Sequence, residues 1–389
     1  WDLSRAEAAA LIGLLRGPAV YDPFNHPDRA LMRRNTVLSQ MVKYEYLPEE
    51  DYEKLKEEPL GVNPARGDYP TGIAPHFVEW IRQTLIEKAE EYGFDIYRDG
   101  LSVYTTLDSR MQRMANRAVE SHLKEYQADF YKAWQWERHP DILKQVVAQA
   151  IRTSDLYRGT DQGHQDSLFR ALSRSRAFVD SIRNVAARIE VGFVALDHSN
   201  GNILAMVGGS NFKNFKYGLN HVTQIQRQPG SAFKPFVYTV AIDNGYPPSF
   251  EVLNQPITIV MANGKRWAPN NFDGTFGGKS TLRDALAYSI NLVAIRLMNE
   301  YAPVNQVIEY ARRMGIRSEL PPYESLAIGT GEVQPLEIIS AYGIYANEGV
   351  AVEPIAILRI EDKYGNVIEE NQPKRREVLS KETAYLMTT

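Results

Sequence analysis

One segment of this 389-residue chain places a serine and a lysine at a spacing that suits nucleophilic catalysis. It reads Gln228-Pro229-Gly230-Ser231-Ala232-Phe233-Lys234-Pro235-Phe236. Residues i and i+3 lie on one face of a helix, so the Lys234 amine is predicted to reach the Ser231 hydroxyl and, when neutral, to remove its proton. The apolar run that follows, ended by Asn244-Gly245, predicts a helix that begins here and turns the positive end of its dipole toward Ser231. The lysine must have a lowered pKa, which burial near another cation would provide.

The Ser-x-x-Lys pattern is weakly specific, because about one chance match is expected in a chain of this length. Two further matches occur. Ser121-His122-Leu123-Lys124 lies inside a helical pattern that begins near Arg110, and we interpret it as a solvated helix face. Ser210-Asn211-Phe212-Lys213 follows Gly208-Gly209 and has no apolar helix behind it. Local context therefore selects Ser231.

A second motif is Ser289-Ile290-Asn291, the only Ser-x-Asn of the chain, which stands between two apolar helical segments. The serine hydroxyl could relay a proton toward a leaving amine, and the asparagine amide could bind a substrate amide. The alternative is a helix break in which Ser289 caps the helix that starts at Asn291. Beside Ser231, the functional interpretation is favoured.

These motifs resemble those of the class A penicillin-binding proteins, which are bifunctional peptidoglycan synthases. Residues 227–235 are similar to the nucleophile segment of that family, and residues 271–283 to its approach to the Ser-x-Asn loop. Residues 326–342 and 100–108 are similar to a later helix start and to the link between the two enzymes of the family. The resemblance covers most of the chain except about 125–188. It implies an α+β fold of the penicillin-binding, serine-transpeptidase kind, with a sheet packed between helices.

The resemblance also implies a reaction and roles for the motif residues. Ser231 would attack the penultimate D-alanine carbonyl of a peptidoglycan stem peptide, and an amine of a second stem peptide would resolve the acyl-enzyme. Lys234 would be the base for acylation, Ser289 the proton relay and Asn291 a clamp on the substrate amide. β-Lactams are implied as covalent inhibitors. The chemistry calls for no cofactor and no metal.

Both ends of the chain differ from the complete family pattern. Residues 3–15, 21–24 and 33–38 resemble the last part of the lipid II glycosyltransferase domain, whose catalytic glutamates would precede Trp1. Glu7 is interpreted as a polar position on an amphipathic helix, and we expect no glycosyltransferase activity from this chain alone.

The third transpeptidase motif, Lys-Thr/Ser-Gly, is absent. In the family its strand binds the substrate carboxylate and supplies one oxyanion N–H, and losing such a donor typically costs about a hundredfold or more in rate. The inferred chemistry is therefore expected of the whole protein, and the chain by itself is expected to be inert.

Four regions are predicted from these patterns. They are the tail of a glycosyltransferase domain (1–46), a linker region (47–124), a helical insertion of unassigned role (125–188) and a transpeptidase domain truncated before Lys-Thr-Gly (189–389).

Helices are expected over 49–57 and 77–92, and within the insertion Trp134 and Trp136 are interpreted as packing residues. A hairpin of strands 191–196 and 203–207, turned at Asn200-Gly201, is expected to open the last domain, with the helix of Ser231 packed against it.

Composition excludes several other functions. The net charge of −4 gives no basic footprint for nucleic acid, and the lack of cysteine rules out disulfides and thiol catalysis. The seven histidines show no metal-binding spacing. No apolar run reaches the roughly 18 residues that span a bilayer.

The family carries its membrane anchor before the glycosyltransferase domain. The resemblance therefore implies that the whole protein lies on the extracytoplasmic side of a bacterial plasma membrane. It also implies lipid II and stem peptides as the substrates of the whole protein.

Two alternatives stay open. A serine β-lactamase shares the first two motifs, but Glu251-Val252-Leu253-Asn254 is one residue shorter than the glutamate motif of such enzymes and precedes the Ser-x-Asn. A non-catalytic interaction module would keep the fold and bind a partner of the envelope machinery through residues 125–188.

Overall fold

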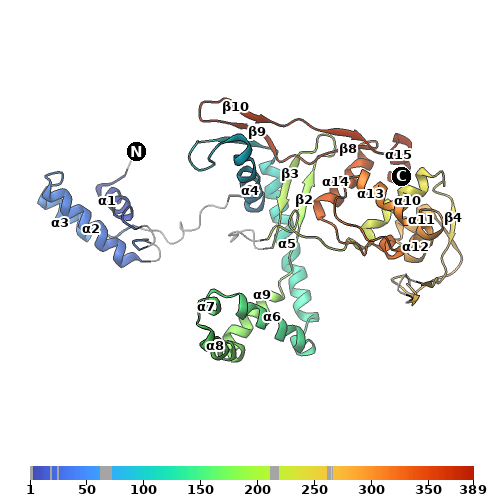
Figure 1. Cartoon of the computed structure of the whole chain (residues 1–389), viewed down its shortest axis with the longest axis horizontal. Coiled ribbons are helices and arrows are strands. Elements are labelled where there is room, and N and C mark those ends of the chain that lie inside the picture. Colours follow the sequence, from blue (N-terminus) through green and yellow to red (C-terminus); the bar gives the residue numbers. More distant parts are fainter. Residues whose placement is uncertain are drawn as a thin grey trace. The chain divides into compact units, whose positions relative to one another are not determined.

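The computed structural model describes residues 3–17, 20–23, 26–61, 72–210, 219–260, 264 and 266–389. The chain falls into two compact units, residues 1–72 and 73–389 (Figure 1). Three parts of the predicted features lie outside the described residues: Phe24 of the family-like segment 21–24, residues 62–71 of the linker region, and residues 211–213 of the Ser-x-x-Lys match at Ser210.

The described residues of the first unit form three helices around a small core. They are α1 (Arg5–Leu14), α2 (Pro27–Lys43) and α3 (Glu49–Glu57). The core contains Ala9, Leu38 and Leu47. Ser4 and Glu7 form a reciprocal capping box at the start of α1, which gives Glu7 a structural role at the helix N-terminus. The helix predicted over 49–57 is confirmed, and it packs on α2 within this unit.

The second unit begins with α4 (Pro75–Tyr92), which ends at Gly93 in the left-handed conformation with φ 72°. β1 (Ser102–Thr105) follows and pairs antiparallel with β9 (Ile357–Glu361), which also pairs with β10 (Val367–Glu370). Apolar residues of α4 share one core with residues of β9. Residues of the predicted linker region thus have buried contacts with the end of the chain.

The predicted hairpin is confirmed as β2 (Phe193–Leu196) and β3 (Ile203–Val207), which pair antiparallel. The free edge of β3 is covered by α5 (Ser109–Ala133). Gln112 of α5 is 1% exposed, donates to the Met206 carbonyl at 3.0 Å and accepts from the Met206 amide at 2.8 Å. The side chain thereby takes the place of a neighbouring strand, because it satisfies both backbone groups of one residue.

Residues 134–186 form a separate helical cluster. Its main helices are α6 (Pro140–Thr153), α7 (Asp155–Arg158), α8 (Gln162–Arg174) and α9 (Arg176–Ala186), which pack on one another (Figure 1). Gln127 of α5, before the cluster, is hydrogen-bonded to the chain that follows the cluster. Its side chain donates to the Ala187 carbonyl and accepts from the Ile189 amide, both at 2.8 Å. Trp134 stacks on His139, with ring centroids 4.0 Å apart. The boundary placed between residues 124 and 125 falls inside α5.

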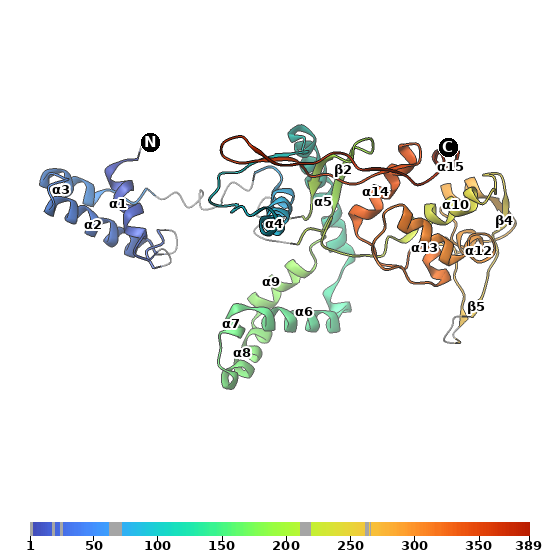
Figure 2. The ribbon, with the colours of Figure 1, turned by 45° about the horizontal axis from the view of Figure 1, so that its top comes forward.

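The largest core lies among the remaining helices. They are α10 (Lys234–Asp243), α11 (Leu282–Ala287), α12 (Asn291–Glu300), α13 (Val304–Arg313), α14 (Pro335–Ala346) and α15 (Lys381–Thr388). Figure 2 shows α10, α12 and α13 side by side, and α10 also packs on α15. The sequence predicted that the helix of Ser231, which is α10, packs on the β2–β3 hairpin. This prediction was wrong, because the helix that contacts β2 is α14. Nearly every residue of α10 is buried, so the helix needs packing partners all round.

Short antiparallel ribbons complete the unit. β4 (Glu251–Leu253) pairs with β7 (Lys279–Thr281), β5 (Ile259–Val260) with β6 (Arg266–Trp267), and β8 (Val350–Val352) with β11 (Arg375–Glu377). The named strands pair only antiparallel, and helices lie between them in the sequence. The predicted α+β class is therefore confirmed. Among the helices of the described residues, none has the length and apolar character needed to cross a bilayer.

Candidate active site

Ser231 lies in a short 3-10 turn, Gly230–Phe233, that leads directly into α10. Phe233 and Phe236 are fully buried and their rings lie 4.8 Å apart, which anchors the turn in the core. The Ser231 side chain, in contrast, is exposed. The sequence pattern predicted the helix start correctly, with Pro235 in the first turn where its missing N–H costs nothing.

The backbone around Ser231 is fixed by residues about a hundred positions later. Gly329 has φ 72°, and a Cβ built on it would stand 2.0 Å from the Gly230 carbonyl oxygen. The Gly230 amide donates to the Gly329 carbonyl at 3.2 Å. Arg227 and Val333 exchange two backbone hydrogen bonds of 3.0 Å, and the Tyr342 hydroxyl donates to the Ala232 carbonyl at 2.8 Å. The nucleophile segment is therefore held on both sides of the serine.

Lys234 is buried, with 1% of its surface exposed, at the start of α10. Its Nζ donates to the Ser289 carbonyl at 2.5 Å, to the Ser289 Oγ at 2.9 Å and to the Asn291 Oδ1 at 2.7 Å. Burial lowers the pKa of Lys234 to about 8. The expected neighbouring cation is not among the causes, since burial alone produces this decrease in the pKa.

The structure brings three of the four predicted residues into one hydrogen-bonded group. Within the described part of the chain, the hydrogen bonds of the Lys234 Nζ go to Ser289 and Asn291 and none goes to Ser231. Ser231 and Lys234 are linked through the backbone, where the Lys234 amide donates to the Ser231 carbonyl. Proton transfer from Ser231 to Lys234 stays a prediction.

Ser289 occupies the break between α11 and α12 in the left-handed region, with φ 55°. A serine in this conformation costs of order 1 kcal/mol, and such strain gathers at functional sites. The alternative in which Ser289 caps the next helix is not what the structure has: the N-cap of α12 is Ile290, without a side-chain hydrogen bond. The Ser289 hydroxyl instead contacts Lys234.

Asn291, at the first position of α12, is held by its two amide atoms. Its Oδ1 accepts from Lys234, and its Nδ2 donates to the Asn270 carbonyl at 3.1 Å. The Asn270 carbonyl can only accept a hydrogen bond, so the Asn291 NH2 group must face it. The Asn291 oxygen therefore faces Lys234.

Asn271 braces the same loop: its Oδ1 accepts from the Leu292 amide at 3.0 Å, and its Nδ2 donates to the Thr275 carbonyl at 2.7 Å. The sequence singled out residues 271–278 only as a family-like segment and missed this supporting role.

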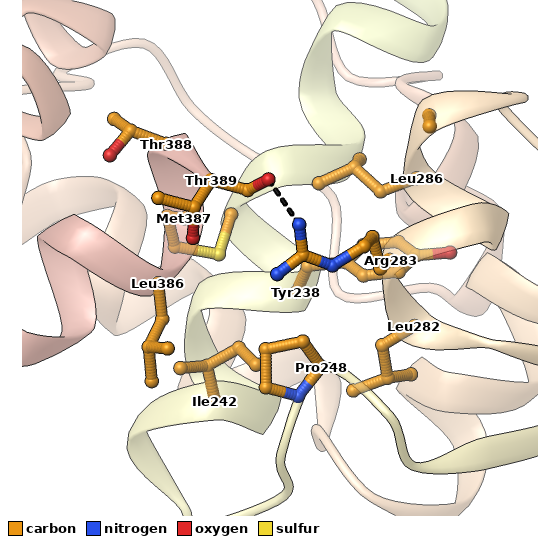
Figure 3. Close-up of a pocket in the computed structure, with 11 residues that line it drawn as sticks. Tyr238, Ile242, Pro248, Leu282, Arg283, Leu286, Leu386, Met387, Thr388 and Thr389 are labelled. Atoms are coloured by element: carbon orange, nitrogen blue, oxygen red, sulfur yellow. Dashed lines mark hydrogen bonds between the residues drawn. The ribbon is translucent and has the colours of Figure 1, made fainter.

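Two cavities lie near these elements. A groove of about 590 Å³ runs beside the nucleophile segment and is lined by Pro229 and Ala232, by Phe193 of β2 and by Ile338 and Tyr342 of α14, among others. A smaller cavity of about 170 Å³ lies between α10, α11 and α15, where Arg283 donates to the Thr389 carbonyl (Figure 3). None of the four predicted site residues lines either cavity.

The described residues contain no group of three or more histidine, aspartate or glutamate side chains that could hold a metal ion.

Residues 191–389, just over half of the chain, match the family described as penicillin binding protein transpeptidase domain. The chain belongs to this penicillin-binding protein family. The match begins two residues before β2 and includes all four predicted site residues.

Named relatives extend the likeness to the first unit. The chain is 32% identical to penicillin-binding protein 1A of Aquifex aeolicus over 98% of its length and 54% of that protein. It is 30% identical to penicillin-binding protein 1A of Pseudomonas aeruginosa, over 96% of the chain and 51% of that protein. The chain thus spans about half the length of these relatives.

A solved structure has the same fold. The crystal structure of penicillin-binding protein 1A from Haemophilus influenzae superposes with a TM-score of 0.71 at 24% identity, covering 99% of this chain and 67% of that one. The PonA1 protein of Mycobacterium tuberculosis, in complex with penicillin V, superposes with a TM-score of 0.53 at 21% identity, over 80% of this chain and 69% of that one. At these identities the likeness concerns the fold alone.

Proposed function

We propose that the transpeptidase region of this penicillin-binding protein cross-links peptidoglycan through an acyl-enzyme on Ser231, with peptides that end in D-alanyl-D-alanine as acyl donors. The observation that carries the proposal is the buried Lys234, whose three hydrogen bonds join it to Ser289 and Asn291. A buried lysine with a pKa near 8 is neutral in a useful fraction of molecules at neutral pH, as a general base must be.

In the acylation step, the Ser231 Oγ forms a bond to the carbonyl carbon of the penultimate D-alanine. Its proton passes to the neutral Lys234 amine. The C–N bond to the terminal D-alanine then breaks, and the leaving nitrogen takes a proton that Lys234 returns through the Ser289 hydroxyl. This relay uses the 2.9 Å contact between the Lys234 Nζ and the Ser289 Oγ.

In the second step, an amine of another stem peptide attacks the ester carbon. The amine loses a proton through the Ser289 hydroxyl to the neutral Lys234, the ester C–O bond breaks, and Ser231 takes that proton back from Lys234. Asn291 is proposed to bind the amide of the acyl donor, because its amide group retains one N–H and one oxygen lone pair beyond the two contacts it already makes.

For the whole protein that carries this sequence, we propose the two activities of class A penicillin-binding proteins, with lipid II as the second substrate and the outer side of a bacterial plasma membrane as the location. The similarity of residues 1–72 to penicillin-binding proteins 1A supports this assignment. β-Lactams are proposed as covalent inhibitors that acylate Ser231. A structure of the PonA1 protein with penicillin V supports the choice of inhibitor class.

The experiment is labelling of the natural full-length protein with a fluorescent penicillin, followed by denaturing electrophoresis. We expect stable labelling that is lost in Ser231→Ala. Ser121→Ala is the matched control, since Ser121 belongs to the same Ser-x-x-Lys pattern but lies exposed on α5. Labelling that persists in Ser231→Ala would show that another residue is the nucleophile.

The same experiment separates the alternatives. Rapid release of hydrolysed drug, with little label retained, would indicate a β-lactamase. Absence of labelling in the folded full-length protein would favour a non-catalytic module and overturn the proposal.

A further inference from the structure

The helical cluster of residues 134–186 contains a groove that the transpeptidase chemistry does not use. Its volume is about 690 Å³, within the range of about 300–1,000 Å³ found for binding pockets. It lies between α6, α8 and α9, and its apolar lining includes Leu143, Val147, Phe169 and Val179. None of the four proposed catalytic or substrate-binding residues lines this groove, so a ligand bound here would be independent of the proposed function.

The charged side chains that line this groove are almost all positive. Five cations face one carboxylate, Glu137; the cations are Lys144, Arg152, Arg170, Arg174 and Arg183. The chain as a whole has a net charge of −4, so the positive lining is a local feature and not the background of the surface. An arrangement of like charges beside apolar surface repels itself unless something of opposite sign compensates it.

Compensation from within the chain is incomplete. Arg183 pairs with Asp180 at 3.2 Å, but its Nε is buried and has no hydrogen-bond partner among the described residues. Arg152 lies over the Phe169 ring, 5.8 Å from its centroid. In the described part of the chain, no ion pair involves Lys144, Arg152, Arg170 or Arg174. Four cations are thus available to an anionic ligand at the margin of an apolar groove.

We propose that this groove binds an acidic amphipathic segment of a partner protein, with apolar side chains against Leu143, Val147 and Phe169 and with aspartates or glutamates opposite the cations. An amphipathic helix is the natural form of such a segment, because apolar side chains at i, i+3, i+4 and i+7 fill a groove while its flanks stay charged. The arginines can bind carboxylates through two parallel N–H donors, which adds orientation to the attraction.

The shape of the groove favours a peptide over an anionic membrane. A bilayer binds helices that project their apolar face outward. Here the apolar floor is less exposed than the cations: Val147 is 6% exposed, and Leu143, Phe169 and Val179 are half-buried, whereas Lys144, Arg170 and Arg174 are exposed. A flat lipid surface would reach the cations but not the floor.

The test is selection from a display library of 16-residue peptides, unbiased in charge, against the full-length protein, followed by titration of synthetic winners by fluorescence anisotropy. We expect the enriched peptides to be acidic and amphipathic, with binding that weakens several-fold between 50 mM and 500 mM salt. The double variant Arg170→Glu/Arg174→Glu is expected to weaken binding at least tenfold. The control is Arg158→Glu/Arg176→Glu, two exposed arginines of the same cluster that do not line the groove.

Each other result would overturn the proposal. Enrichment of neutral or basic peptides, equal weakening by both double variants, or no enrichment at all would exclude an acidic peptide as the ligand of this groove. Vesicles of phosphatidylcholine and phosphatidylglycerol at 3:1 form a second arm. Binding to these vesicles that only the Arg170→Glu/Arg174→Glu variant loses, without selection of acidic peptides, would assign the groove to a membrane instead. Circular dichroism of both variants checks that the helices are retained.

Discussion

The Lys234 Nζ donates to both the backbone carbonyl and the hydroxyl of Ser289, at 2.5 and 2.9 Å, although the two residues are 55 positions apart. Ser289 has a left-handed backbone, with φ 55°, at the break between α11 and α12. The strained turn and the lysine therefore support each other: the turn supplies two acceptors, and the buried amine supplies the donors that those acceptors need.

The first prediction concerns the pH dependence of acylation. Only neutral Lys234 can accept a proton from Ser231, and its pKa is about 8. The rate of labelling by penicillin should therefore rise about tenfold per pH unit below pH 8 and level off above it. Stopped-flow or quenched labelling between pH 6 and pH 10 measures this profile. A rate that is independent of pH across this range would remove Lys234 as the base.

The second prediction concerns Asn291→Asp. The new carboxylate would replace the Oδ1 that now accepts from Lys234 at 2.7 Å, and an adjacent negative charge favours the ammonium form. We expect the apparent pKa of acylation to rise from about 8 by about 1–3 pH units, so that labelling at pH 7.5 slows by about eightfold or more. The measurement is the same pH–rate profile.

The control for this variant is Asn305→Asp, which makes the same substitution on the exposed surface of α13. It should leave the profile unchanged. An Asn291→Asp protein that is merely slower, with the midpoint still near pH 8, would mean that Asn291 acts on the substrate without influencing the lysine.

The third prediction concerns stability. Burial disfavours the charged form of Lys234, so its pKa falls from the ordinary 10.5 to about 8 in the folded chain. Between these two pH values the unfolded chain binds more protons than the folded chain, and the free energy of unfolding rises with pH. Lys234→Met keeps the length of the side chain and removes the charge.

Relative to Lys234→Met, the wild-type protein should therefore gain stability as pH rises from about 8 to 10.5, and show a constant difference below pH 7. Denaturant titrations of both proteins at several pH values measure the difference, in which all other titrating groups cancel. A difference that stays flat up to pH 10.5 would mean that the lysine titrates normally. The variant should also lose penicillin labelling by about 10²–10⁴-fold.

Sequence patterns predicted the local parts of the site well. The helix start at Ser231, the left-handed hairpin turn at Gly201 and the break at Ser289 follow from residues within a few positions of each, and all three are present. The family resemblance added that Lys234, Ser289 and Asn291 belong together, and their hydrogen bonds join them. These features depend on backbone geometry or on short spacings, which one segment of sequence can specify.

The supporting contacts could not be predicted, because they join segments that no local period relates. Asn270 orients Asn291 through its backbone carbonyl, an atom that every residue possesses, so its side chain gave no signal. Buried residues of α10 fit a sheet or helices equally well as partners, and the choice between them is made by tertiary packing. Gly329 looked like part of a family segment, but its reason for being glycine is the carbonyl of Gly230.

The last prediction uses this contact between Gly329 and Gly230. In Gly329→Ala the new Cβ would stand 2.0 Å from the Gly230 carbonyl oxygen, a backbone atom that cannot rotate away. Gly365→Ala is the matched control, since Gly365 also has a positive φ, of 85°, but nothing lies within 4 Å of its Cβ position. The control should lose only about 1–2 kcal/mol of stability for the left-handed conformation and keep its rate of penicillin labelling.

Gly329→Ala is expected to have one of two larger effects. Either the overlap stays and the variant loses more than about 3 kcal/mol of stability, or the Ser231 turn is displaced and penicillin labels the variant at least tenfold more slowly. Thermal unfolding and the rate of penicillin labelling are measured on both variants. Equal losses of stability and equal labelling rates in the two variants would show that the close approach of Gly329 to Gly230 does not hold the nucleophile in place.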